Sequence, residues 1–195
     1  MNVGIFGGSF NPVHKGHIAL AQYLLEHSSL DEIWLTLSPL NPLKARPDEL
    51  IADAERLEML QLACQGHPGL KACDIELTLP RPSYTINTLN ALCAQYPENQ
   101  FRIVIGTDNW QIFDKWRSAQ EIIDRFGVVV YPRPGYELNK AESGNVEFLT
   151  DAPTFDISST QIRQMAAQGA SPAEYLDTKV WAYIKSHELY GYKNN

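Results

Sequence analysis

The sequence has few cysteines, and no apolar run in it is long enough to cross a membrane. The three cysteines are an odd number and form no CxxC pair, so we interpret them as reduced thiols rather than a disulfide framework. No apolar run approaches the ~20 residues that a membrane-spanning helix needs. The first residues, MNVGIFGG, hold neither a basic segment nor a long apolar one, which predicts no secretory signal. We therefore expect a soluble, cytoplasmic protein with no membrane partner.

Positive charge is also scarce, because 16 Lys+Arg face 23 Asp+Glu for a formal net charge of −7. Duplex nucleic acid needs a broad basic surface, so we expect no nucleic-acid partner. Any phosphate that the protein binds must be met locally, by backbone N–H groups, helix N-termini and a few cations. The sequence also lacks G-x-G-x-x-G and G-K-[ST], which removes the main support for a dinucleotide-dependent oxidoreductase or a P-loop protein.

The composition is that of one globular domain over 1–195, with 44% hydrophobic and 20% charged residues. Strand-like and helix-like segments alternate along the chain. The predicted strands span 2–6, 32–37, 70–77 (one or two short strands), 101–105, 127–131 and 146–149. The predicted helices span 16–27, 52–64, 84–95, 118–125, 158–167 and 177–186. This alternation predicts an α/β fold with a doubly wound, mostly parallel, Rossmann-like sheet and a small helical C-terminal part from about 156.

The unusual polar residues of the chain fall in the loops that leave the predicted strands. Ligands of doubly wound folds bind at the carboxyl ends of the strands, where these loops lie. We therefore expect the loops to converge on one edge of the sheet; they span 7–14, 38–49, 106–110, 132–144 and 150–158.

The first of these loops reads GGSFNPVHKGH and joins a strand to a helix. Its glycines let the backbone approach a phosphate, and the helix N-terminus offers N–H donors. His14 and His17 lie three residues apart, hence on one helix face, where imidazoles can donate hydrogen bonds to phosphate oxygens. Two alternatives are that these histidines only cap or pack, or that they bind zinc, for which no third ligand is evident.

A second motif, DISSTQIR, lies near the C-terminus. Ser158 and Gln161 have the spacing of a capping box, which predicts a well-capped helix. The hydroxyls at this helix N-terminus and Arg163 one turn later also predict an anion site, since arginine suits bidentate phosphate contact. Both interpretations can hold together.

In combination, G-x-F-N-P-x-H-x-G-H and I-S-S-T-x-I-R resemble the HxGH nucleotidyltransferase superfamily over nearly the whole chain. Within it, the chain is most similar to the bacterial nicotinate-nucleotide adenylyltransferases. Four further segments carry this resemblance: NPLK at 41–44, RPSYT at 81–85, IGTD at 105–108 and FDKW at 113–116. One departure is Leu43, where many members have histidine.

The resemblance implies adenylyl transfer from ATP to nicotinate mononucleotide, with Mg²⁺ carried by ATP and no metal site built from protein ligands. It assigns catalysis to His14, His17 and Arg163. It assigns ATP binding to those three residues and to Gly7, Gly8, Ser9, Phe10, Gly106, Asp108, Ile157, Ser158 and Ser159. It assigns the mononucleotide to Lys44, Arg46, Thr85, Asp108, Trp116 and Arg133.

Three of these residues also have an alternative interpretation without a binding role. Trp116 can be a core residue, Asp108 a turn residue and Lys44 a solvated loop lysine. Rival functions are an enzyme that prefers nicotinamide mononucleotide, a phosphopantetheine adenylyltransferase or cytidylyltransferase of the same superfamily, and a nucleotide-binding regulator without activity. The oligomeric state is left open.

Overall fold

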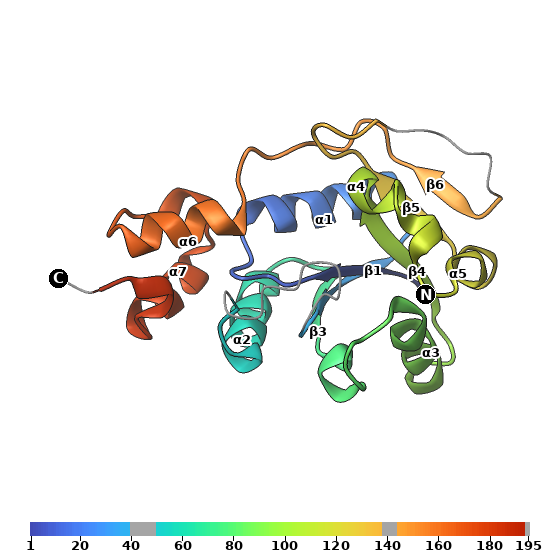
Figure 1. Cartoon of the computed structure of the whole chain (residues 1–195), viewed down its shortest axis with the longest axis horizontal. Helices are drawn as coiled ribbons and strands as arrows, with labels where there is room; N and C mark the ends of the chain where they lie inside the picture. The colour runs from blue at the N-terminus through green and yellow to red at the C-terminus, as the bar shows by residue number, and fades with distance from the viewer. Residues whose placement is uncertain (40–49, 138–143, 194–195) are drawn as a thin grey trace.

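The computed structural model describes residues 1–39, 50–137 and 144–193. In these ranges six strands form one parallel sheet in the order β3-β2-β1-β4-β5-β6 (Figure 1). This order confirms the predicted doubly wound, Rossmann-like fold. The strands are β1 (Asn2–Gly8), β2 (Glu32–Leu37), β3 (Leu70–Cys73), β4 (Gln100–Gly106), β5 (Val128–Tyr131) and β6 (Val146–Phe148).

Helices cover both faces of the sheet; in Figure 1, α1 and α3 lie on opposite sides of it. They are α1 (Lys15–His27), α2 (Asp53–Cys64), α3 (Thr85–Gln95), α4 (Thr107–Trp110), α5 (Ala119–Arg125), α6 (Ser159–Ala167) and α7 (Thr178–Ser186). Short 3₁₀ turns are η2 (Ile75–Thr78), η3 (Phe113–Lys115), η4 (Ala173–Tyr175) and η5 (Leu189–Gly191). None of the helices in the described ranges is long and apolar enough to cross a membrane.

Two apolar cores hold the layers together because successive strand residues face opposite sides of the sheet. Ile103 and Ile105 of β4 pack with α3 and α5, whereas Val104 packs with α1 and α2 on the other face. Strands buried on both faces are typical of parallel sheets. After β3 the chain crosses to the other face of the sheet and returns as β4, which pairs with β1. The strand order therefore reverses between β1 and β4, and the crevice of the fold opens where these two strands end.

The C-terminal helices join one of these cores rather than forming their own. Ile162 of α6 and Ile184 of α7 are fully buried in the same apolar cluster as Leu24 of α1. The single domain over 1–195 stays a prediction, and this shared core supports it.

Of the one or two short strands predicted in 70–77, β3 forms over Leu70–Cys73, and the prediction is wrong after Cys73. The chain turns there into η2, in which the Leu77 N–H donates to the carbonyl of Asp74 over 2.8 Å. The turn directs the Glu76 carboxylate to the hydroxyls of Ser83 and Thr88, both at 3.0 Å. A straight strand would not allow both hydrogen bonds, so side-chain pairing outweighs strand propensity here.

Candidate active site

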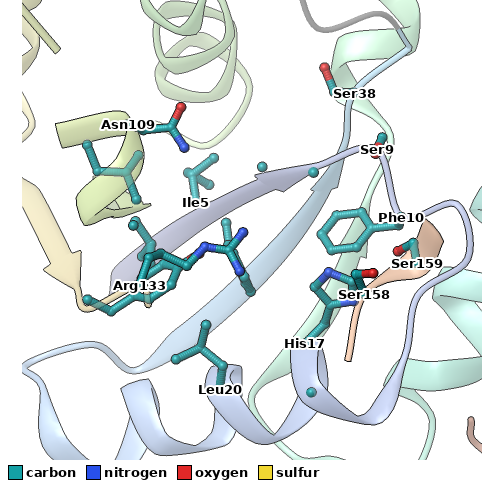
Figure 2. Close-up of a pocket in the computed structure, with 18 of the residues that line it drawn as sticks. Ile5, Ser9, Phe10, His17, Leu20, Ser38, Asn109, Arg133, Ser158 and Ser159 are labelled. Atoms are coloured by element: carbon teal, nitrogen blue, oxygen red, sulfur yellow. The ribbon is translucent and has the colours of Figure 1, made fainter. Parts of the chain in front are cut away.

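A cavity of about 860 Å³ opens at the carboxyl ends of the strands (Figure 2). Every one of the five predicted loops contributes to its wall, which confirms that they converge on one edge of the sheet. One lining residue from each loop, in chain order, is Gly8, Ser38, Gly106, Arg133 and Ser158.

The cavity wall is basic although the chain is acidic. Among the described residues that line it, the cations are Lys115, Arg117, Arg133 and Arg163, whereas the only carboxylate is that of Glu76. Glu76 already accepts hydrogen bonds from two hydroxyls at its own oxygens. The wall therefore concentrates positive charge in one place, as an anionic substrate requires.

The first motif leaves β1 and enters α1 at His14, the N-cap residue. The His14 N–H donates to Nδ1 of His17 over 3.2 Å, and the two rings stack with centroids 3.7 Å apart. Because Nδ1 of His17 accepts a hydrogen bond, its proton is on Nε2. His17 lines the cavity, so its ring forms part of the wall that a substrate meets (Figure 2).

His14 is 7% exposed. Burial, with a smaller contribution from the Arg133 guanidinium, lowers the pKa of His14 from 6.5 to about 4, so its ring is neutral at pH 7. Its Nδ1 atom is buried without a hydrogen-bond partner among the described residues. A Cβ on Gly16 would lie 3.0 Å from that Nδ1, so a larger residue there would press against the His14 ring.

The second motif contacts the first. Ser158 and Gln161 form the predicted capping box at the start of α6. The Ser159 hydroxyl donates to the carbonyl of Pro12 over 2.8 Å, and Arg163 Nη1 donates to the carbonyl of Asn11 over 2.9 Å. Two segments about 150 residues apart in the sequence are thereby tied into one wall of the cavity; Figure 2 labels His17, Ser158 and Ser159 among the residues that line it.

Of the residues predicted for the mononucleotide, Thr85, Trp116 and Arg133 line the cavity. Thr85 begins α3, which lies on the opposite side of the sheet from α1 (Figure 1). Trp116 follows η3 and lines the cavity, and its Nε1 is buried without a hydrogen-bond partner in the part of the chain described. Arg133 lines the cavity with Nε 3.7 Å from Oδ1 of Asp108, which itself lies just behind the wall. Lys44 and Arg46 lie outside the described residues.

The remaining predicted residues Gly7, Gly8, Ser9, Phe10, Gly106 and Ile157 also line the cavity. The sequence analysis missed other lining residues, among them Asn11, Tyr84, Asn109, Arg117 and Phe155. Asn11 and Tyr84 lie inside the quoted motifs, so their position was a usable signal. Arg117 packs over the Tyr84 ring at 5.0 Å from its centroid, a contact that has no signature in the sequence.

Comparisons with known proteins agree with this geometry. The family model described as cytidylyltransferase-like matches residues 5–165. A protein of Bacteroides fragilis named a probable nicotinate-nucleotide adenylyltransferase is 46% identical over 93% of this chain and 90% of its own. One of the same name from Bacteroides thetaiotaomicron is 46% identical over 96% of this chain and 92% of its own.

A solved structure shares the fold at greater evolutionary distance. Nicotinic acid mononucleotide adenylyltransferase of Plasmodium falciparum, in complex with NaAD, superposes with a TM-score of 0.78 over 98% of both chains at 17% identity. By its sequence relatives and its matching family model, the chain belongs to the nicotinate-nucleotide adenylyltransferases of the cytidylyltransferase-like family.

Proposed function

We propose that the protein transfers the adenylyl group of ATP to nicotinate mononucleotide, forming nicotinate adenine dinucleotide and pyrophosphate. The observation that carries this proposal is the joining of the two motifs, through Ser159–Pro12 and Arg163–Asn11, at one basic cavity where the sheet reverses its strand order. Names of relatives that are 46% identical point to the same reaction. The setting that we propose for it is the cytoplasm, with no nucleic-acid partner.

The chemistry needs no covalent enzyme intermediate. The phosphate of the mononucleotide is an anion at neutral pH, so it attacks the α-phosphorus of ATP directly. One P–O bond forms, the bond from the α-phosphorus to the bridging oxygen breaks, and pyrophosphate leaves with the electron pair. Catalysis then consists of placing two anions in line and stabilising the charge that develops on phosphate oxygens.

His17 is the central donor in this mechanism. His17 lines the cavity, and because its Nδ1 accepts the His14 N–H, its ring donor is the Nε2–H. We assign it to the α-phosphate, where it hydrogen-bonds an oxygen that gains charge in the transition state. His14 is held neutral by burial, and we assign its ring to the ATP phosphates as a hydrogen-bond donor rather than as a cation.

The β- and γ-phosphates face α6 in this proposal. The Ser159 hydroxyl and Arg163 Nη1 already donate to carbonyls of the first loop. The Gln161 N–H already donates to Ser158 Oγ in the capping box. We therefore assign the first two N–H groups of α6, those of Ser159 and Thr160, to these phosphates, with Ser158 and Arg163 beside them. Mg²⁺ arrives as Mg·ATP, held mainly by phosphate oxygens and water, and EDTA should abolish turnover.

The mononucleotide takes the opposite wall, where Trp116 stacks on the pyridine ring and the N-terminus of α3 at Thr85 receives its carboxylate. We assign the rest of the mononucleotide to four further residues: Asp108, Arg133 and the loop residues Lys44 and Arg46. A carboxylate is favoured at a helix N-terminus over a neutral amide. We therefore expect the acid to be preferred over nicotinamide mononucleotide.

The direct test is pyrophosphate release from Mg·ATP, with nicotinate mononucleotide, nicotinamide mononucleotide and phosphopantetheine in parallel. Release with the nicotinate substrate alone is the expected result. Equal release with both mononucleotides would remove the selectivity, and release with phosphopantetheine alone would overturn the function.

His17→Ala should lower kcat by about 10²–10³, the usual cost of one preorganised donor, and change the KM for ATP less. His27→Ala is the matched control, because His27 lies at the exposed end of the same helix. A kcat within twofold of wild type in His17→Ala would contradict the role of His17.

A further inference from the structure

Arg56, on α2, is fully buried although it does not line the cavity. Its guanidinium has five N–H groups, and each has an acceptor. Nε donates to the carbonyl of Ile51 over 3.3 Å. Nη2 donates to the carbonyl of Pro39 over 3.5 Å and to the Asp53 carboxylate over 2.5 Å. Nη1 donates to the carbonyls of Ser9 over 2.6 Å and Ser38 over 3.0 Å. Buried arginine is costly unless every donor is paired, so this complete set is a built feature.

These hydrogen bonds join two loops that line the cavity. Ser9 belongs to the first motif after β1, and Ser38 follows β2. The Ser38 N–H in turn donates to the carbonyl of Gly8 over 2.9 Å. Arg56 thus braces both loops from behind, on the side that faces away from the cavity.

The direction of one peptide group shows what this bracing does. The Ser9–Phe10 peptide is trans, because the cis bonds among the described residues follow Asn11 and Arg81. In a trans peptide the C=O and N–H point in opposite directions. With the Ser9 carbonyl held by Arg56 behind the wall, the Phe10 N–H is turned toward the cavity, where Ser9 and Phe10 are lining residues.

The backbone at this point does not hold its shape by itself. Phe10 has φ 43°, a left-handed conformation that is strained for a bulky residue. Such a conformation persists only when the surroundings impose it. The charge-assisted hydrogen bond from Arg56 to Ser9, adjacent to Phe10, is a contact able to impose it.

The counter-charge extends the network to the other wall of the cavity. Asp53 accepts from Arg56 at Oδ1 and from Arg81 at Oδ2, the latter over 2.7 Å. Arg81 opens the segment that leads into α3. One carboxylate therefore links the bracing of the first loop to the segment on the opposite side of the cavity.

We propose that Arg56 is a positioning residue of this site: it holds the Ser9 carbonyl so that the Phe10 N–H is aimed at the phosphates of the bound nucleotide. The proposal rests on the proposed function only in that the nucleotide is ATP. Arg56 itself touches no substrate.

The test compares Arg56→Lys with Glu55→Gln. Lysine keeps the charge beside Asp53 but cannot serve the Ser9 and Ser38 carbonyls as the planar guanidinium does. Glu55→Gln is the control at the adjacent position of α2. The Glu55 carboxylate accepts a hydrogen bond from the Tyr183 hydroxyl of α7 over 2.6 Å, and Glu55 does not line the cavity. Both variants are assayed for pyrophosphate release and for the Kd of Mg·ATP, well below their melting temperatures.

Arg56→Lys should lose about 100-fold in kcat, the usual cost of a small misplacement in a reacting site, and bind Mg·ATP more weakly. Glu55→Gln should lose stability but keep kcat and Kd within twofold. The Kd of Mg·ATP separates the proposal for Arg56 from the proposed function. If the wild-type protein binds Mg·ATP but does not use nicotinate mononucleotide, the proposed function is refuted. The role of Arg56 can then still be tested through the Kd of Mg·ATP. Kinetic constants within twofold of wild type in folded Arg56→Lys would overturn the proposal.

Where Arg56→Lys does not fold, Arg56→Ala is assayed with low concentrations of guanidinium chloride or sodium chloride. Restored turnover in guanidinium alone is expected, because that ion can occupy the place of the side chain. If neither variant folds under any of these conditions, the role of Arg56 is structural and the positioning proposal is wrong.

Discussion

The neutral state of His14 makes a quantitative prediction about stability and pH. His14 is 7% exposed, and burial followed by the Arg133 charge lowers its pKa from 6.5 to about 4. In the unfolded chain the ring regains its ordinary pKa. Between these two values the unfolded state takes up a proton that the folded state does not, so folding loses free energy as the pH falls. The contribution is fully present above pH 6.5 and is lost as the pH falls through about 4.

The size of the effect follows from the difference in pKa. One pKa unit corresponds to about 1.4 kcal/mol, so the full loss is about 3 kcal/mol, of which about 2 kcal/mol is already lost at pH 5. That is a large share of the 5–15 kcal/mol that typically stabilises a domain. Arg133→Gln should raise the pKa of His14 and so reduce the loss of stability at low pH, because the Arg133 charge is one of the two causes that lower this pKa.

The assay is urea denaturation of wild type and His14→Gln at pH 7.5, 6 and 5. Other titrating groups contribute to both proteins, so the difference between the two pH profiles isolates His14. The stability of wild type should fall by about 2 kcal/mol more than that of His14→Gln between pH 7.5 and 5. His27→Gln, at an exposed position, serves as control and should follow wild type. Parallel profiles for wild type and His14→Gln would refute the reasoning that His14 is buried as a neutral ring.

Three further outcomes are expected. Trp116→Ala should raise the KM for the mononucleotide about tenfold and leave that for ATP nearly unchanged, as steady-state kinetics will show; the opposite pattern would refute ring stacking. Gly106→Ala should lower kcat/KM, because the added Cβ would lie 2.5 Å from Oδ1 of Asp108 and 2.7 Å from Cγ of Arg133 and would displace both side chains; an unchanged value would show that neither side chain is needed in its present position. Tyr190→Phe removes a 3.1 Å hydrogen bond to Oδ1 of Asn11 and should lower the free energy of unfolding by about 1 kcal/mol in urea denaturation, and no change would mean that this bond adds nothing.

Most of the sheet could be predicted from local patterns. The segment 32–37 is an apolar, β-rich run between turn residues, and β2 has the same bounds. Residues 70–77 look similar in sequence, yet β3 ends at Cys73 because Glu76 pairs with Ser83 and Thr88. A local pattern cannot report a pairing with hydroxyls that belong to another segment.

The candidate site divides in the same way. The residues of both motifs were identified from the sequence because glycine, histidine and capping residues have short-range meaning. Arg56 was missed, although it shares the buried face of α2 with Met59, Leu60 and Ala63, where a charged residue is unexpected. That position was a usable signal, but its acceptors are mainly backbone carbonyls, which look the same at every residue.

By itself the sequence determined the α/β class, the order of the elements, the two motifs and the edge of the sheet at which they meet, since all of these follow from local propensity and from the geometry of parallel strands. The tertiary structure alone decided that Ser159 and Arg163 donate to loop carbonyls, that His17 carries its proton on Nε2 and that His14 is neutral. Each of these depends on which groups the folded chain brings within hydrogen-bond distance and which it removes from water. Proton positions and pKa values are therefore properties of the packed site and not of the motif.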